Sequence, residues 1–334
     1  MKKKKNILYI ISGETGFKET DEKILKSFAN VKKVNYQYQS FFDYLNPKTL
    51  YYMTWADAIL IWFASIHAIP AILLNYFFNK GLFIIANGWD VADVPKIAYG
   101  AMRGGSRKII GRWILSRATK VIADSKSNRN EILNNAKVHP RRIQLIYLAV
   151  PNDEVDSVQE KINQVLTVGE INEETFFRKG IDRFINVAKK LPDVQFFHIG
   201  KWTDKSGNPC EKTIDYAKKN SPSNIQFLGY QNKKELLRYY RESKIYLQLS
   251  RHETFGVSVV EAMASGCIPV VSNQYALPEI VGKNGYITDS NIDSTVNIIR
   301  EILKSKFEDN NPNILNKDFS IDVRTNLFKE LLIN

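Results

Sequence analysis

Residues 245–272 read IYLQLSRHETFGVSVVEAMASGCIPVVS, and their pattern indicates the fold class. An apolar run of strand length, Ile245–Leu249, precedes a polar loop. A helix-length segment then opens after Gly256, and a second apolar run, Ile268–Ser272, follows it. A strand, a helix and a second strand in this order are typical of a parallel α/β layer.

The same alternation continues along all 334 residues, a length that allows two domains with separate cores. We therefore predict an α/β fold of two Rossmann-like, doubly wound domains facing a cleft, with ligands at the carboxyl ends of the strands. The polar segment Pro151–Lys161 is the predicted linker, so the predicted domains are 1–152 and 153–317, followed by a helix in 318–334. The expected strands are Ile7–Ser12, Val31–Tyr36, Ala58–Phe63, Leu82–Asn87, Lys120–Asp124, Ile143–Tyr147, Gln164–Gly169, Gln195–Gly200, Ile225–Leu228, Ile245–Leu249, Ile268–Ser272 and Tyr286–Thr288.

Two carboxylates, Glu253 and Glu261, are separated by seven residues around the Phe-Gly turn of the opening stretch. Gly256 lets the backbone approach a ligand closely, and the amides that follow it form a helix N-terminus suited to a diphosphate. Acceptor side chains on both sides of an anion site suit the hydroxyls of a sugar and of a ribose. The stretch therefore predicts a nucleotide-sugar site, although acids near helix starts are also common for structural reasons alone.

Two features bear on the cell compartment. Cys210 and Cys267 are too few for a disulfide framework, which favours buried thiols in a reducing cytoplasm. The N-terminal MKKKKNILYIIS resembles a signal peptide, but its short apolar run meets Gly13 and Glu14 instead of a small-residue cleavage site. We interpret it as a first strand.

The segment Ala58–Phe78 has no charged residue and reaches the length of a membrane span. Polar residues and Pro70 interrupt it, and buried parallel strands also read as continuous apolar runs. We therefore predict a strand, a loop and a helix with proline near its first turn.

Positive charge is concentrated in the first half of the chain. Residues 1–150 hold 23 Lys and Arg against 10 Asp and Glu (+13), and the remainder holds 24 against 25 (−1). The stretch Met102–Arg142 is densest, and apolar Ile109, Ile110, Trp113 and Ile114 interleave with its cations. Such a segment suits an anionic membrane surface, or it is a surface helix with a solvated basic face. No nucleic-acid motif accompanies the charge, so we expect no nucleic-acid partner.

Several motifs resemble the catalytic half of the family 4 retaining glycosyltransferases. They are VGEINEETFFRKGID (168–182), FFHIG, NIQFLGY, the run from KELLRYY to PVVSN that contains the opening stretch, and LPEIVGKNGYIT. The resemblance is strong over residues 164–288 and looser for ANGWDV (86–91) and KVIADSKSNRNEI (120–132). It implies a GT-B fold and a last helix that crosses back to the first domain.

The resemblance also implies roles for single residues. Glu253 matches the first glutamate of the family's Glu-x7-Glu motif and would contact the donor sugar, and Glu261 matches the second and would hold the ribose. Lys179 matches the lysine that neutralises the donor phosphates. Adjacent Arg178 would share that role, and the backbone of Phe255, Gly256 and Val257 would face the phosphates. No metal and no other cofactor is expected.

Two positions depart from the family pattern. Glu170 stands where many members have a phosphate-binding arginine, so either Arg178 supplies the missing cation or the donor contacts differ from the family's. Asn87 stands where members often have histidine, and an amide hydrogen-bonds a sugar hydroxyl without protonating anything near neutral pH. Asp90 is either an acceptor-side ligand or a helix cap. Gly13, in the loop after the first strand, is a candidate donor contact.

The leading hypothesis is a hexosyltransferase (EC 2.4) that moves sugar with retention from a UDP-, GDP- or ADP-linked donor to a glycan or lipid-linked acceptor. The expected location is cytoplasmic, peripheral on the inner membrane face. Two rival classes remain. One is a sugar-nucleotide epimerase on a similar scaffold, and the other is a non-catalytic protein that binds membrane or nucleic acid.

Overall fold

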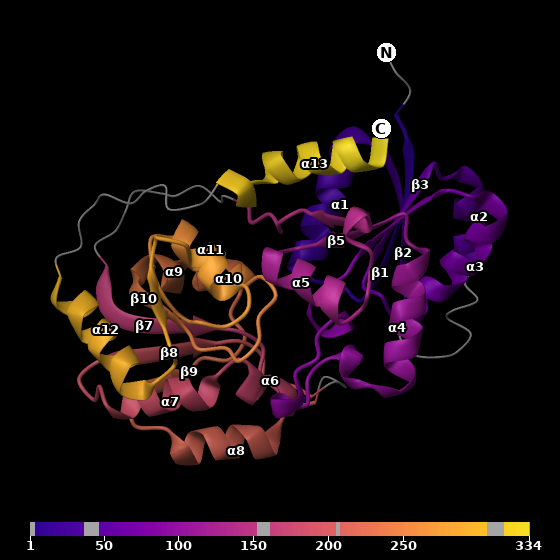
Figure 1. Ribbon diagram of the computed structural model, residues 1–334. Helices are drawn as coiled ribbons and strands as arrows, with labels where there is room; N and C mark the ends of the chain where they lie inside the picture. The colour runs from indigo at the N-terminus through magenta and orange to yellow at the C-terminus, as the bar shows by residue number, and fades with distance from the viewer. Residues whose placement is uncertain (1–3, 37–46, 152–160, 205–207, 306–316, 334) are drawn as a thin grey trace. The chain divides into compact units, whose positions relative to one another are not determined.

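The structure is a computed structural model that describes residues 4–36, 47–151, 161–204, 208–305 and 317–333 (Figure 1). The chain divides into two compact units, and each is considered by itself. Unit 1 comprises Met1–Pro151 with Lys317–Asn334, and unit 2 comprises Asn152–Asn316. All but the end residues of the predicted linker Pro151–Lys161 lie outside the described residues.

Unit 1 is built on a six-stranded parallel sheet in the order β2-β1-β3-β4-β5-β6. Because β1 pairs with β2 on one side and with β3 on the other, the order reverses at β1. The strands are β1 (Asn6–Ser12), β2 (Asn30–Tyr36), β3 (Ala58–Trp62), β4 (Gly81–Ile85), β5 (Lys120–Ala123) and β6 (Ile143–Leu145). The helices are α1 (Gly16–Phe28), α2 (Pro47–Trp55), α3 (Ile69–Phe78), α4 (Gly105–Arg117), α5 (Lys126–Asn134) and α13 (Ile321–Ile333).

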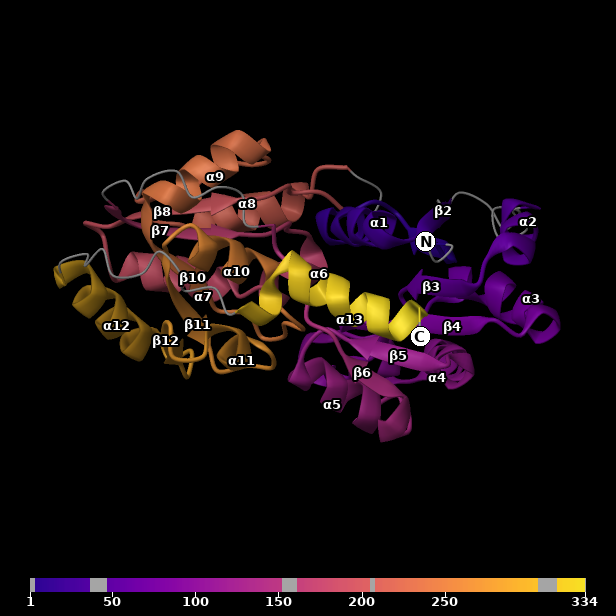
Figure 2. The ribbon, with the colours of Figure 1, turned by 90° about the horizontal axis from the view of Figure 1, so that it is seen from above.

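Unit 2 repeats this architecture with a parallel sheet in the order β12-β11-β10-β7-β8-β9. Helices α9 and α10 lie on one side of it, and α7 and α8 lie on the other (Figures 1 and 2). The strands are β7 (Ile162–Val168), β8 (Gln195–Ile199), β9 (Ile225–Phe227), β10 (Ser243–Gln248), β11 (Ile268–Ser272) and β12 (Tyr286–Thr288). The helices are α6 (Glu173–Arg178), α7 (Ile181–Lys189), α8 (Glu211–Asn220), α9 (Lys233–Glu242), α10 (Val257–Ala264), α11 (Leu277–Val281) and α12 (Ile292–Lys304).

All twelve strands predicted from apolar runs are confirmed. The central strands β3 and β10 are buried along their whole length, since helices cover both faces of each sheet. In unit 2 the order reverses between β7 and β10, so the loops after these two strands meet at one point of the sheet edge. Open α/β sheets bind ligands at such reversals.

The uncharged segment Ala58–Phe78 forms β3, a short 3-10 turn and α3, which confirms the predicted strand, loop and helix. Pro70 occupies the first turn of α3, where it forfeits no helical hydrogen bond. No helix in the described parts of the chain is both long enough and apolar enough to cross a membrane.

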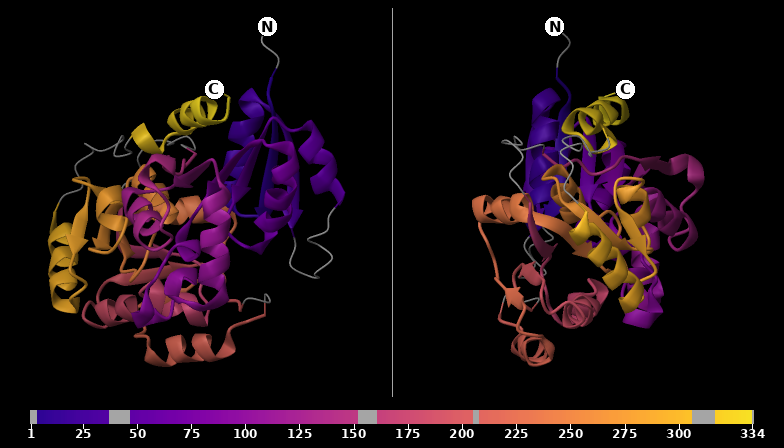
Figure 3. Two further views of the ribbon diagram at one scale, coloured as in Figure 1. Left: turned by 45° about the vertical axis from the view of Figure 1, so that its right-hand side comes forward. Right: turned by 90° about the vertical axis from the view of Figure 1, so that its left-hand side faces the viewer.

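Helix α13, the last helix of the chain, packs on α1 within unit 1, and the two are the yellow and the indigo helix in Figure 3. Arg324 on α13 makes a bidentate ion pair with Asp21 on α1, with N–O distances of 2.6 and 2.7 Å. Both side chains are buried. Arg324 also donates to the carbonyls of Ile146 and Tyr147, which follow β6. A single guanidinium thus joins the last helix to the first helix and to the end of the sheet.

Candidate active site at the sheet reversal of unit 2

The loop after β10 and the segment that links α6 to α7 meet at the sheet reversal of unit 2. Lys179 Nζ lies 2.5 Å from Glu253 Oε2, and both side chains are largely buried. Gln248, the last residue of β10, donates to the same carboxylate oxygen at 3.3 Å. The structure therefore brings together the lysine and the first glutamate that the sequence singled out.

Glycine makes this close approach possible. Gly180 has φ +72°, and a Cβ at this position would lie 2.1 Å from the carbonyl oxygen of Leu249. Only glycine fits so close to another backbone segment in this conformation. The segment that carries Lys179 is therefore pressed against the start of the loop that carries Glu253.

Arg251 also joins the two segments. Its guanidinium makes a bidentate ion pair with Asp182 on α7, at 2.7 Å for each bond. Its backbone N–H donates to the carbonyl of Arg178 at 2.7 Å. The sequence analysis did not single out these two residues. Their only sequence signal is proximity, since Arg251 stands two residues before Glu253 and Asp182 stands two residues after Gly180.

The two charges shift one another's pKa. Burial alone would raise the pKa of Glu253, but the cations of Lys179 and Arg178 outweigh it and hold that pKa below its ordinary value. Burial lowers the pKa of Lys179, against the opposing attraction of Glu253. The site thus holds a carboxylate and an ammonium away from bulk water, where charges interact strongly.

Helix α10 begins directly after this loop. Gly256 is its N-cap with φ +93°, and the carbonyl of Gly256 accepts from the N–H groups of Val259 and Val260. Phe255 is buried and anchors the turn, and Val257 is the first helical residue. The N-terminal amides of a helix attract anions, and those of α10 follow the loop that carries Glu253, the partner of Lys179.

Glu261 lies one turn further into α10, away from the Lys179–Glu253 pair. The hydroxyl of Tyr240 on α9 donates to Glu261 Oε2 at 3.1 Å. Tyr240 is buried, and burial followed by the nearby charge of Glu261 raises its pKa, so the phenol stays protonated as a donor. Tyr240 was also missed at the sequence level, since its contact with Glu261 depends on how α9 and α10 pack.

Glu170, which stands in place of the family's arginine, and Arg178, the candidate to replace that cation, make different contacts. Arg178 Nη1 lies 3.4 Å from the carbonyl oxygen of His252, so this arginine follows the loop after β10. Glu170 is exposed in the loop after β7 and accepts from the hydroxyl of Thr203 at 3.2 Å. Arg178 is therefore the cation that adjoins the Glu253 loop, whereas Glu170 is turned toward Thr203.

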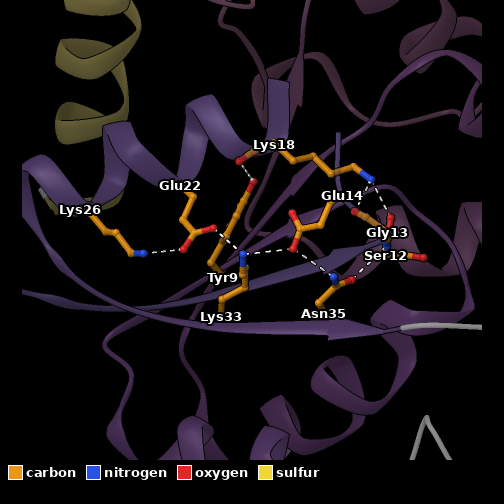
Figure 4. A network of polar contacts seen from close by, with 9 residues as sticks. All are labelled: Tyr9, Ser12, Gly13, Glu14, Lys18, Glu22, Lys26, Lys33 and Asn35. Carbon is orange, nitrogen blue, oxygen red and sulfur yellow. Dashed lines mark hydrogen bonds and ion pairs between the residues drawn. The ribbon is translucent and has the colours of Figure 1, made fainter. Parts of the chain in front are cut away.

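Gly13 belongs to unit 1 and follows β1 at the reversal of that sheet (Figure 4). Its N–H donates to Asn35 Oδ1 at 3.0 Å, and its carbonyl accepts from Lys18 Nζ at 2.9 Å. Its φ is +65°, and a Cβ here would meet no heavy atom within 4 Å. The loop is thus fixed by its backbone, with open space beside it.

Ion pairs on the neighbouring strand extend this network. Lys33 on β2 contacts Glu14 at 3.1 Å and Glu22 at 2.6 Å, and Asn35 donates to Glu14 at 3.1 Å (Figure 4). The β1–α1 connection is therefore held by β2 as well as by α1.

Asn87 and Asp90 lie after β4 in unit 1. Asp90 is buried, and its Oδ2 accepts from the backbone N–H groups of Ala64 at 3.0 Å and Asn87 at 3.4 Å. Burial raises the pKa of Asp90 to about 7, against the opposing effects of these donors and of Lys18. These contacts fit the helix-cap interpretation of Asp90, since its carboxyl accepts from the backbone of the loops after β3 and β4.

Two further features of the described residues concern cofactor and redox chemistry. In the ranges that the structure covers, no group of three or more His, Cys, Asp or Glu side chains is placed to hold a metal ion. Cys210 and Cys267 are both buried free thiols.

Comparisons with solved structures give the fold. HepE of Anabaena, solved in complex with UDP-glucose, aligns with a TM-score of 0.78 at 15% identity over 98% of this chain and 99% of that one. Sucrose-phosphate synthase of Thermosynechococcus elongatus aligns with a TM-score of 0.78 at 14% identity over 98% of each chain. These neighbours have the GT-B fold, which confirms the predicted fold class.

Sequence comparisons give the family. An uncharacterized glycosyltransferase of Methanocaldococcus jannaschii is 31% identical over 189 residues, which are 55% of this chain and 50% of that protein. Alpha-galactosylglucosyldiacylglycerol synthase of Streptococcus pneumoniae is 29% identical over 163 residues, 46% and 39% of the two chains. The chain spans about half the length of the curated relatives it matches.

A family model matches residues 151–318, just over half of the chain, and this range holds the Lys179–Glu253 pair and helix α10. The chain therefore belongs to the family described as glycosyl transferases group 1.

Proposed function

We propose that the protein is a hexosyltransferase that binds a nucleotide-sugar donor at the sheet reversal of unit 2. The observation that carries this proposal is the contact of Lys179 with Glu253 beside the N-terminus of α10. An ammonium and a helix N-terminus together suit a diphosphate, and the adjacent carboxylate suits the hydroxyls of the attached sugar.

In this proposal each residue has a separate part. Glu253 contacts the donor sugar, Glu261 holds the ribose, and Lys179 with Arg178 neutralises the phosphates. The backbone of Phe255, Gly256 and Val257 faces the phosphates. Gly13 contacts the donor. Asn87 and Asp90 lie on the acceptor side, Asn87 as a ligand and Asp90 as the cap that holds the loops after β3 and β4.

Charge development explains why these residue types suit glycosyl transfer. Negative charge grows on the departing diphosphate as the anomeric carbon becomes positive, so cations and helix dipoles fixed in advance stabilise the transition state. We propose transfer with retention, as in family 4, with the leaving phosphate accepting the proton of the acceptor hydroxyl. This step requires no side-chain nucleophile and no metal, so EDTA should not reduce the rate.

We propose a glycan or a lipid-linked acceptor at the cytosolic membrane face. Two relatives support this choice, because the name of one specifies a glycolipid product and the name of the other a lipid-linked glycan. One is the diacylglycerol-modifying synthase of Streptococcus pneumoniae, and the other is a GDP-mannose:cellobiosyl-diphosphopolyprenol alpha-mannosyltransferase of Xanthomonas oryzae, 26% identical over 97 residues. UDP is the first nucleotide to test, since HepE was solved with UDP-glucose.

Calorimetric titration tests the donor site. Wild type and Glu261→Ala are titrated with UDP, GDP, ADP and their common sugar conjugates. Tight binding of one nucleotide series that weakens in the variant supports the proposal, and no binding across the panel by wild type overturns it.

Product analysis separates transfer from epimerisation. An epimerase converts the sugar of the donor when no acceptor is present, whereas a transferase requires the acceptor. The anomeric configuration of the product, read by NMR, then distinguishes retention from inversion.

A further inference from the structure

One face of α3 exposes a stripe of large apolar side chains. Leu73, Tyr76 and Phe77 are 50%, 59% and 86% exposed, and their spacing of three and four residues places them on one side of the helix. No residue of α3 is charged. Isolated apolar residues on a surface are ordinary, but three on one uncharged helix face form a patch that indicates an interaction site.

Helix α4 lies beside α3 and adds a cation to this patch. The guanidinium of Arg117 lies 5.7 Å from the ring centre of Tyr76, which places the end of α4 against the stripe. Arg117 is itself exposed. We call Leu73, Tyr76, Phe77 and Arg117 the α3–α4 surface.

The structure places the exposed apolar residues on a different helix from the one that the sequence suggested. The sequence suggested an amphipathic stretch within Met102–Arg142, with four apolar residues interleaved among its cations. Ile114 is buried, and Ile110 and Trp113 pack against the core of unit 1, so of these four Ile109 alone is largely exposed. Arg112 is also committed, since it donates twice to the carbonyl of Asn135. The apolar face therefore belongs mainly to α3, and α4 supplies charge.

We propose that the α3–α4 surface docks on a bilayer that contains anionic lipids. Apolar side chains that enter the interface and cations that attract lipid headgroups act together in peripheral membrane binding. Tyrosine suits the interface because its ring is apolar and its hydroxyl is polar. The ten residues of α3 span about 15 Å, half of the hydrocarbon core, so the helix lies in the plane of the interface.

This inference rests on the proposed function for its purpose, which is to bring unit 1 to a lipid-linked acceptor. Its physical content is independent of the donor. The excess of +13 in residues 1–150 favours an anionic partner over a neutral one.

Vesicle co-sedimentation of the whole chain tests the proposal. The vesicles are pure phosphatidylcholine or a mixture with phosphatidylglycerol. One variant removes apolar contact (Phe77→Ser), and a second removes charge (Arg117→Gln). Matched controls on α8 of unit 2 are Tyr216→Ser, at a side chain that is 51% exposed in wild type, and Lys218→Gln, at an exposed lysine.

We expect wild type to prefer the anionic vesicles and each α3–α4 variant to bind them roughly tenfold more weakly. The α8 controls should bind like wild type. Nucleotide titration of every variant should match wild type, so loss of vesicle binding is separated from failure of the donor site.

Three outcomes would overturn the assignment. The first is wild-type protein that ignores anionic vesicles, and the second is equal vesicle binding by the α3–α4 and α8 variants. The third is light scattering that shows a dimer of wild type which Phe77→Ser converts to monomer, since the stripe would then be covered by a second copy of the chain.

Discussion

Lys179 Nζ and Glu253 Oε2 lie 2.5 Å apart although the two residues are 74 positions apart in the chain. The contact exists because β10 pairs with β7, which brings the loops after these strands to one point of the sheet edge. A donor phosphate that approaches Lys179 would meet an ammonium already balanced by a carboxylate. Binding would therefore redistribute this charge pair instead of neutralising a lone cation.

Lys179→Met should weaken nucleotide-diphosphate binding more than Glu253→Gln does, because the ammonium faces the phosphates and the carboxylate faces the sugar. We expect a coupling energy of about 0.5–3 kcal/mol between the two substitutions, the range for residues in direct contact. A double-mutant cycle of donor dissociation constants measures it. Strict additivity would show that the pair is not a unit in the donor complex.

Glu261→Ala should weaken nucleotide binding by about 1–3 kcal/mol, since it removes hydrogen bonds to a charged acceptor. Tyr240→Phe removes only the hydroxyl that donates to Glu261 and should cost less. Calorimetry with the preferred nucleotide and with the free base distinguishes a contact with the ribose from a contact with the base. Equal loss for the free base would argue against a ribose contact by Glu261.

Gly180→Ala should destabilise unit 2 severely, because the added Cβ would lie 2.1 Å from the Leu249 carbonyl oxygen. Gly13→Ala is the matched control, with a similar positive φ but open space around the Cβ. We expect Gly13→Ala to cost only about 1–2 kcal/mol of unfolding free energy, for the left-handed backbone conformation. Chemical denaturation measures both, and equal effects would contradict the packing argument.

Asp90 should make unit 1 less stable as pH rises from about 4 to about 7. Its pKa of about 7 lies above the ordinary value, so the folded state keeps a proton that the unfolded state has already released. The stability is full below the ordinary pKa and is lost as pH rises through the folded value. Each pKa unit corresponds to about 1.4 kcal/mol.

Denaturation of wild type and Asp90→Asn across this pH range isolates the contribution of the carboxyl. The difference in unfolding free energy between the two proteins should shift in favour of the variant as pH rises. A difference that is constant with pH would show that Asp90 is ionised throughout.

Removing one partner of the Arg324–Asp21 pair should be strongly destabilising. Asp21→Asn or Arg324→Met leaves a buried group without its counter-charge and should cost about 3–5 kcal/mol. The exposed pair Lys190–Asp293 is the control, and Asp293→Asn should cost less than about 1 kcal/mol. Similar values for the two pairs, measured by urea denaturation, would contradict a buried role for Arg324.

The strands were predictable because a parallel strand covered on both faces needs apolar side chains throughout, as Ile59 to Trp62 illustrate. The start of α10 was predictable because Gly256 marks it locally. Tyr240 and Asp182 were not, since their contacts depend on which strands are neighbours and how helices pack. The exposure of Phe77 was hidden for the same reason, because an apolar helix reads alike whether its outer face is covered or bare.

The position of α13 has a consequence for how the molecule is assembled. In the sequence, unit 2 is inserted between the two segments of unit 1, because the chain leaves unit 1 after β6 and returns only at residue 317. Asp21 is therefore synthesised long before Arg324, which follows 303 positions later in the chain. During synthesis the carboxylate of Asp21 is therefore solvated or paired with another group until unit 2 and α13 have been synthesised. Unit 1 is thus completed last although it is begun first.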